Sequence, residues 1–325
     1  MKNYLLSTLF LSLLFISCTP KTPKLVLVDS NGRMNQLLLV MNNDLWEHKE
    51  GDELKVALYE EVHGLPQKEP QFNVTHVEVN GFGYLFKKSK SVLIVGLGKK
   101  SEYSIQTNIY AKPQTIIKLI EPTKEELIKS IQEKRAEIVK VFKEEDLKAV
   151  QYRLRNKLFE TKNLTTLTKL GVSMEIPDSY KLVDDTGDFL WLRQHIQKQQ
   201  TMNLLVYELP INSSDDEAGK NILLARDAIG EKFIPGAKEG MYMITEAAYI
   251  PQILPTILDG KKAYQTRGKW EVKGAFMAGP FLSYTLVDKP NNRLVVIEGF
   301  TYAPATNKRD YMFEIEAVLK TVKIQ

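Results

Sequence analysis

The sequence predicts one long helix over residues 123–158, which read TKEELIKSIQEKRAEIVKVFKEEDLKAVQYRLRNKL. Thr123 and Glu126 match a capping box, in which two side chains satisfy backbone N–H groups at a helix start. Apolar residues then recur at helical spacing: Leu127, Ile131, Ile138, Phe142, Leu147, Val150, Leu154 and Leu158. A continuous helix would be about 55 Å long, although a bend near residues 143–146 is equally possible. A helix of this length can pack on one domain and carry the chain to the next.

The residues before this helix predict a β-sheet with a packed helix. The run Leu37-Leu38-Leu39-Val40 is typical of a buried strand, and a helix begins near Asp52. Strands are expected at 36–41, 74–79, 91–97 and 104–110, the last two paired through residues 98–100.

Residues 161–170 are polar and rich in Thr, and we place the domain boundary there. The N-terminal domain would span residues 31–165 and the C-terminal domain residues 166–325. In the second domain, strands are expected at 172–177, 188–196, 202–209, 241–249, 262–272, 275–287 and 293–302, and helices at 220–233 and 308–321. This order predicts an α+β fold in both domains, each an antiparallel or mixed sheet, the second with helices packed on one face.

The N-terminus is typical of a bacterial lipoprotein signal. Lys2 precedes an apolar run over residues 5–16, and Ser17 precedes Cys18, the only cysteine of the chain. We expect residues 1–17 to be a signal peptide and residues 18–30 a tether lipidated on Cys18. Phe15 departs from the usual Leu at its position.

The tether carries Lys21 and Lys24 rather than the acidic residues of surface-exported lipoproteins. We therefore expect a cell-envelope protein that is anchored to the membrane by lipid and faces the periplasm. Lipidation of Cys18 would leave no thiol for a disulfide, a metal site or a nucleophile. The net charge is +4, and without a basic block interleaved with aromatic residues, nucleic acid is not an expected partner.

Several motifs suggest a cofactor or a metal site, but each lacks neighbouring residues that such a site requires. Residues 92–98, VLIVGLG, lack the third glycine and the following helix of a dinucleotide-binding turn. The four histidines form no close ligand pair, and Asp184–Asp188 lacks the spacing of a calcium loop. We expect no cofactor and no metal.

Two groups of residues are candidate binding sites. Lys308 and Arg309 open the last helix, where free N–H groups favour an anion. Arg267 and Arg293 could join them, the alternative being a solvated basic edge. A second group could line an aromatic groove, or could simply pack in the core: Trp191, Trp270, Phe276, Phe281 and Phe300.

Short motifs in order along the chain resemble an uncharacterised family of Bacteroidota envelope lipoproteins, domain of unknown function 4837. The matching stretches are Ser30–Arg33, Asn35 with Leu37–Val40, Asp44–Trp46, Gly64–Gln67, Glu69–Phe72, Trp191–Arg193, Gly279–Phe281, Gly299–Pro304 and Lys308-Arg309. The resemblance covers nearly the whole mature chain and implies no catalytic residue. In element order, the second half also resembles a PsbP-like α/β/α sandwich, which is an analogy of fold alone.

We expect a non-enzymatic binding or envelope-assembly module, whose partners are the membrane and either envelope proteins or an anionic ligand. One alternative is an envelope hydrolase with a dispersed site near Asp188, Arg193 and His195. Another is a carrier of lipids or small ligands with an enclosed apolar cavity.

Overall fold

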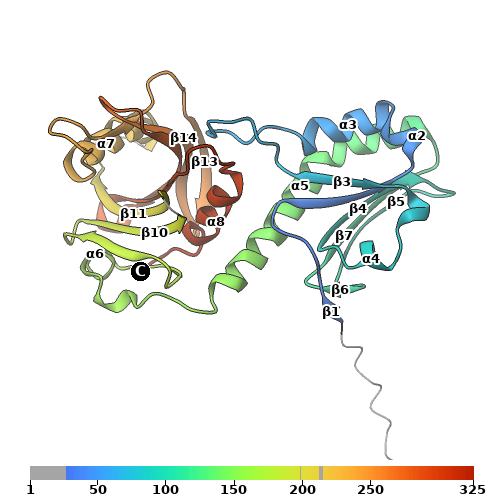
Figure 1. Ribbon diagram of the computed structural model, residues 1–325, viewed down its shortest axis with the longest axis horizontal. Coiled ribbons are helices and arrows are strands. Elements are labelled where there is room, and N and C mark those ends of the chain that lie inside the picture. The colour runs from blue at the N-terminus through green and yellow to red at the C-terminus, as the bar shows by residue number, and fades with distance from the viewer. Residues whose placement is uncertain (1–26, 198, 212–214) are drawn as a thin grey trace, which may run out of the picture.

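The computed structural model describes residues 27–197, 199–211 and 215–325. These residues form two α+β domains, joined by one long helix (Figure 1). The expected signal peptide and Cys18 lie outside the described residues. Among the residues that the structure describes, none of the helices has the length and hydrophobicity of a membrane-spanning segment.

The N-terminal domain contains a five-stranded mixed sheet in the order β3-β2-β4-β7-β5. Its strands are β2 (Gln36–Met41), β3 (Asn73–Val77), β4 (Ser91–Leu97), β5 (Glu102–Thr107) and β7 (Thr115–Glu121). The first four in this order are parallel, and only β5 is antiparallel to its neighbour. A small parallel pair, β1 (Val28–Asp29) with β6 (Ala111–Lys112), lies beside this sheet.

The expected pairing of residues 91–97 with 104–110 is wrong, because β7, which is outside the expected strands, lies between β4 and β5. The core strand β4 is a continuous apolar run, as expected of a parallel strand buried on both faces. In contrast, β5 is largely exposed and suits the sheet edge.

Helices cover both faces of this sheet. On one face lie α2 (Asn43–Trp46), α3 (Lys49–Leu58) and α5 (Lys124–Leu154), and the other carries η1 (Val79–Gly81) and α4 (Tyr84–Lys87). The helix α5 has no bend, and the Thr123 hydroxyl accepts a hydrogen bond from the Glu126 N–H at its start. It ends at Leu154, before the expected residue 158, and Leu158 instead forms a β-bridge with Pro177. The first turns of α5 pack on the N-terminal sheet, and Leu147 and Val150 contact the C-terminal domain.

The C-terminal domain contains an eight-stranded antiparallel sheet in the order β12-β14-β15-β16-β11-β10-β9, with β13 also paired to β14. Its strands are β9 (Lys181–Asp185), β10 (Phe189–Gln197), β11 (Gln200–Pro210), β12 (Met243–Thr245), β13 (Gln252–Leu258), β14 (Lys261–Val272), β15 (Ala278–Asp288) and β16 (Arg293–Tyr302). A separate pair joins β8 (Val172–Ser173) to β17 (Lys323–Ile324). The strands β9 and β13 lie outside the expected ones.

Helices cover both faces of this sheet too, so the expectation of helices on one face is wrong. The helices α6 (Thr165–Leu170) and α8 (Arg309–Leu319) cover one face and α7 (Asp215–Phe233) covers the other, with η2 (Thr161–Asn163) and η3 (Lys289–Asn291) as short turns. The reason lies in β16, where Val295 and Ile297 face α8 while Val296 and Phe300 face α7.

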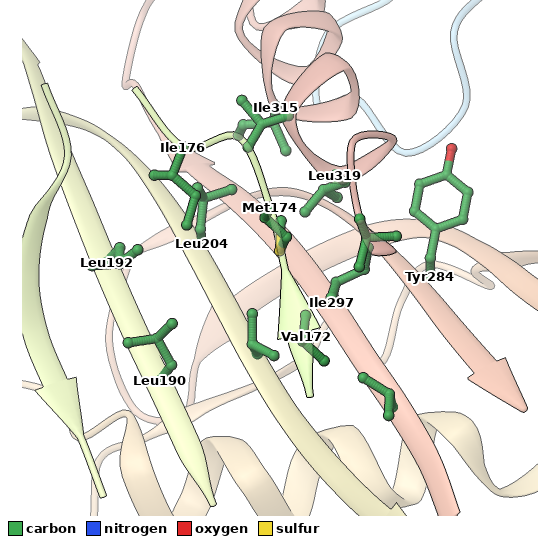
Figure 2. Packing of buried hydrophobic residues seen from close by; sticks show 14 of the residues in the cluster. Val172, Met174, Ile176, Leu190, Leu192, Leu204, Tyr284, Ile297, Ile315 and Leu319 are labelled. Carbon is green, nitrogen blue, oxygen red and sulfur yellow. The ribbon is translucent and has the colours of Figure 1, made fainter. Parts of the chain in front are cut away.

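The core beneath α8 is a close fit between helix and sheet. Figure 2 shows Ile315 and Leu319 above the side chains of the strands, among them Leu204 and Ile297. A Cβ atom at Gly299 would lie 2.2 Å from Ile315 Cγ2, so a side chain there would push the helix away. Leu167 and Leu170 of α6 belong to the same core, and we therefore propose that the C-terminal domain begins near residue 165.

A buried ion pair holds α7 on the opposite face. Arg226 Nη2 lies 2.8 Å from Glu298 Oε1, and the guanidinium stacks on Phe281 at 3.8 Å. Burial raises the pKa of Glu298, and Arg226 opposes that rise. Removing one partner would therefore leave a buried charge without compensation.

We predict that Arg226→Ala lowers the free energy of unfolding by about 3–5 kcal/mol, measured by urea unfolding. The double variant Arg226→Met/Glu298→Leu should recover most of this loss, since it replaces both charges with apolar groups. A loss below about 1 kcal/mol for Arg226→Ala would contradict this account.

Candidate functional site

A cleft of about 300 Å³ opens between the two domains. Its walls come from α5, α8, the strands β13 and β14, and a segment that we call the docking loop, residues 59–72. The docking loop leaves the N-terminal domain and reaches the C-terminal domain (Figure 1). Its lining includes the side chains of His63, Lys143, Arg267, Arg309, Phe313 and Glu316.

The docking loop enters the core of the other domain. Leu65 is buried in the cluster beneath α8, and the Gly64 N–H donates to the Tyr249 hydroxyl at 2.9 Å. Gly64 has a φ of +83°, and a Cβ atom there would lie 3.0 Å from the backbone nitrogen of Gly268. Only glycine combines this conformation with so close an approach.

Glu69 of the docking loop caps the N-terminus of α8. Its carboxylate accepts hydrogen bonds from the Lys308 N–H at 2.7 Å and the Arg309 N–H at 3.2 Å. The side chain is only 4% exposed. A carboxylate in this place satisfies two unpaired N–H groups and lies at the positive end of the helix dipole.

The side chains of Lys308 and Arg309 also bind the docking loop. Lys308 Nζ donates to Gln67 Oε1 at 2.8 Å, and Arg309 Nη1 donates to the Pro70 carbonyl at 2.8 Å. The cations that open α8 therefore hold the two domains together.

Asn35 connects the domains at the inner end of the cleft. It is fully buried, with a φ of +58°. Its side chain donates to Asp310 of α8 at 2.8 Å and accepts from Lys143 Nζ at 2.7 Å, and its N–H donates to Asp146 at 2.6 Å. Asn is among the few non-glycine residues that adopt this backbone conformation readily.

Lys143 on α5 is the most unusual titratable group of the cleft. Burial and the nearby positive charges of Arg309 and Arg267 together lower its pKa to about 7, against the opposing effect of Asp146 and Glu316. Its ammonium donates to Asn35 and to the Gln71 carbonyl, both at 2.7 Å, and lies 4.5 Å from the Phe72 ring centroid.

Glu316 provides the negative charge on the opposite wall. Burial by itself would raise its pKa, but Arg267 and Lys320 outweigh burial and lower the pKa to about 2. Arg267 Nη2 lies 2.7 Å from its carboxylate, and Tyr284 donates to the same group at 3.1 Å.

The expected anion-binding residues are only partly brought together. Arg267 and Arg309 line the cleft, and Lys308 lies beside Arg309 at the start of α8. Arg293 belongs to a separate network, where it pairs with Asp288 at 2.9 Å. The free N–H groups expected at the start of this helix are already bonded to Glu69.

The expected aromatic groove is instead part of the core beneath α7. Trp191, Trp270, Phe281 and Phe300 are all buried in one cluster, whereas Phe276 is fully exposed. These four side chains pack against the sheet and α7, as in the alternative that we gave for them.

The residues expected for a hydrolase do not line the interdomain cleft. Asp188 precedes β10, and Arg193 follows about 17 Å further along that strand. Arg193 donates to Asn203 and stacks on Trp191, and His195 is exposed near the strand's end.

Sequence reasoning missed Glu69, Asn35 and Lys143 as members of the site. Glu69 and Asn35 both fall within stretches quoted for the family resemblance. Lys143 gave no local signal, because its burial depends on the docking loop and on α8, which are far away in the sequence.

We predict that Glu69→Ala lowers the free energy of unfolding by about 2 kcal/mol, because two buried N–H groups lose their acceptor. Glu69→Gln, which keeps one acceptor oxygen, should lose less. The control Glu61→Ala, an exposed change in the same loop, should shift stability by under about 0.5 kcal/mol. Equal urea-unfolding curves for Glu69→Ala and Glu61→Ala would contradict the capping role.

We also predict a pH dependence from Lys143. Its pKa is about 7 when folded and 10.5 in a model compound. Between these values the unfolded state binds more protons, so the free energy of unfolding rises with pH. Lys143→Met should remove this rise, and Lys148→Met, a change at an exposed lysine of the same helix, should keep it. Urea unfolding from pH 6.5 to 10 measures the slope, and equal slopes in both variants would contradict the prediction.

Solved structures resemble about half of the chain. LpqN of Mycobacterium tuberculosis, involved in cell envelope biogenesis, is 13% identical over 46% of this chain and 82% of LpqN, with a TM-score of 0.29. The Ran-binding protein Mog1p of Saccharomyces cerevisiae is 8% identical over 47% of this chain and 90% of Mog1p, with a TM-score of 0.33. A protein of Bacteroides thetaiotaomicron is 10% identical over 48% of this chain and 45% of its own length, with a TM-score of 0.25.

No curated protein matches the chain. Two family models match the chain, each over a different part of it. The domain of unknown function DUF8532 matches residues 30–155. The domain of unknown function DUF4837 matches residues 159–321, which is narrower than the nearly complete coverage expected for it. Through this second match, which takes in half of the sequence, the chain belongs to the DUF4837 family.

Proposed function

We propose that the protein is a lipid-anchored binding module of the cell envelope that faces the periplasm and binds an anionic group in the interdomain cleft. The observation that carries this proposal is the meeting of Lys143, Arg267 and Arg309 in one cleft, close enough for both arginines to lower the pKa of the lysine. An incoming carboxylate or phosphate would offset their mutual repulsion.

The hydrogen bonds within the cleft support the same ligand class. An ammonium has three donors, and Asn35 and Gln71 accept from that of Lys143. This leaves one donor to point at a bound oxygen. Arg267 is already paired with Glu316, so it would act on the ligand through its charge rather than as a clamp.

The outer part of the cleft is acidic, which limits the size of the ligand. Glu60, Glu61 and Glu144 line it together with Lys140 and Lys320. A long polyanion would meet these carboxylates, whereas a single anionic group could reach Lys143 without them. This arrangement favours a small anion, or one acidic side chain of an envelope protein, over nucleic acid.

In the alternative, an envelope hydrolase, the same residue, Lys143, would be the catalytic base. A pKa near 7 suits a general base at neutral pH. Conversion of a ligand, rather than its recovery unchanged, would favour this alternative. The carrier alternative has less support, because the space beneath α7 is filled by the aromatic side chains of the core.

The first experiment measures anion binding by calorimetry, with inorganic phosphate and citrate as probes. We expect binding at pH 6, where Lys143 is charged, and roughly tenfold weaker binding at pH 9, where it is neutral. Lys143→Met should bind weakly at both values, and the matched control Lys148→Met should behave as the wild type. Absence of binding at pH 6, or binding in Lys143→Met equal to that in wild type, would contradict the proposal.

The second experiment addresses the anchor. The apolar run over residues 5–16, followed by Ser17 and Cys18, supports cleavage before the cysteine and acylation of its thiol. We predict that protein extracted from membranes begins at Cys18 and carries the added mass of its acyl chains. Cys18→Ser should leave the membrane fraction. An unmodified cysteine in the mature protein would contradict the anchor while leaving the anion site untouched.

A further inference from the structure

One surface of the N-terminal domain exposes apolar side chains beside lysines, and we call it the α4 surface. It consists of Phe82, Tyr84, Leu85, Phe86, Lys87, Lys88, Tyr110 and Lys112. Tyr84 is 71% exposed and Leu85 is 75% exposed. Such a group of large apolar side chains in water is a usual mark of an interaction site.

Ring contacts hold the parts of this surface together. Phe82 lies edge-on to Tyr110, with 6.4 Å between the ring centroids. Lys87 lies 5.3 Å from the Tyr110 centroid, and Lys88 lies 4.2 Å from that of Tyr84. The helix α4 and the loop before β6 therefore present one continuous face.

The charge of this surface is mainly positive, although the exposed Asp29 of β1 is paired in register with Lys112. Residues 79–90 and 109–112 contain four lysines and no Asp or Glu. Lys90 is largely buried and paired with Asp146, whereas Lys87 and Lys88 lie over the rings of Tyr110 and Tyr84. Lys112 is exposed on β6. Aromatic residues with lysines at their margin are typical of the boundary between lipid acyl chains and headgroups.

The chain from Cys18 enters the fold at this surface. The Ser30 N–H donates to the Lys112 carbonyl at 3.1 Å, and the Asn31 N–H donates to the Lys88 carbonyl at 2.7 Å. Figure 1 shows β1 and β6 side by side, near α4, at one end of the domain. Residues 18–26, even when extended, reach only about 30 Å, so an anchor on Cys18 would hold this face near the bilayer.

We propose that the α4 surface rests on an anionic phospholipid bilayer, the one that holds the lipid of Cys18. Tyr84, Leu85 and Phe86 would insert at the level of the headgroups, and Lys87, Lys88 and Lys112 would contact lipid phosphates. This proposal rests on the proposed lipid anchor, which makes contact with a membrane continuous rather than occasional. The anchor then fixes the orientation of the domain as well as its location.

The test uses the full mature chain with Cys18→Ser, so that binding does not depend on acylation. We expect it to sediment with vesicles of phosphatidylcholine and phosphatidylglycerol, and at least tenfold less with phosphatidylcholine alone. Adding Tyr84→Ser/Leu85→Ser should weaken binding at least tenfold. Ile250→Ser/Ile257→Ser, a matched change at exposed apolar residues of the other domain, should leave it unchanged. Lack of binding, or equal binding by the two double variants, would overturn the proposal.

A second measurement uses the acylated protein in vesicles that contain brominated lipid. Tyr84→Trp should show fluorescence quenching that Ile257→Trp does not. If the acylated protein shows no such quenching, the α4 surface does not contact the bilayer and the proposal is wrong, whereas the proposed lipid anchor is unaffected. Recruitment of another envelope protein through Tyr84 and Leu85, without quenching, would also overturn the proposal in favour of a protein partner.

Discussion

The relation between the two domains depends on one carboxylate, that of Glu69, which lies buried against the first turn of α8. A buried charge is stable only where donors surround it, and here the donors belong to the other domain. Separating the domains would leave the Lys308 and Arg309 N–H groups without their partner and would expose Leu65 from the core beneath α8. The polar contact and the apolar contact therefore form and break together, so the cleft exists only while the domains are docked.

This arrangement explains why the cations in the cleft are tolerated. Lys143 lies on the helix that both domains share, and its ammonium is held by Asn35 and the docking loop. Because its pKa is about 7, Lys143 can lose its proton near neutral pH, and the uncharged amine is less costly to bury than the ammonium. An anion in the cleft would favour the charged lysine and, by the same linkage, the docked arrangement of the domains. Ligand binding and domain docking are then two aspects of one equilibrium.

Local sequence patterns predicted much of the fold but few of the residues in the interdomain cleft. The capping box at Thr123, the period of α5 and the apolar runs of β2 and β4 depend on nearby residues, and each lies where the pattern places it. Some errors are missed strands, namely β7, β9 and β13. The others concern how segments pack: the insertion of β7 between β4 and β5, and the second helical layer over β16. The basic residues at the start of α8 were recognisable, but their partner Glu69 lies more than 200 residues earlier in the sequence.

Native-state hydrogen exchange tests most directly whether Glu69 caps α8 across the domain interface. The first N–H groups of an ordinary helix have no partner and exchange quickly. If the capping holds, the amides of Lys308 and Arg309 exchange as slowly as those of Ile315 and Leu319 in the same helix. Exchange as fast as that of the exposed Lys124 and Glu125 amides at the start of α5 would contradict it.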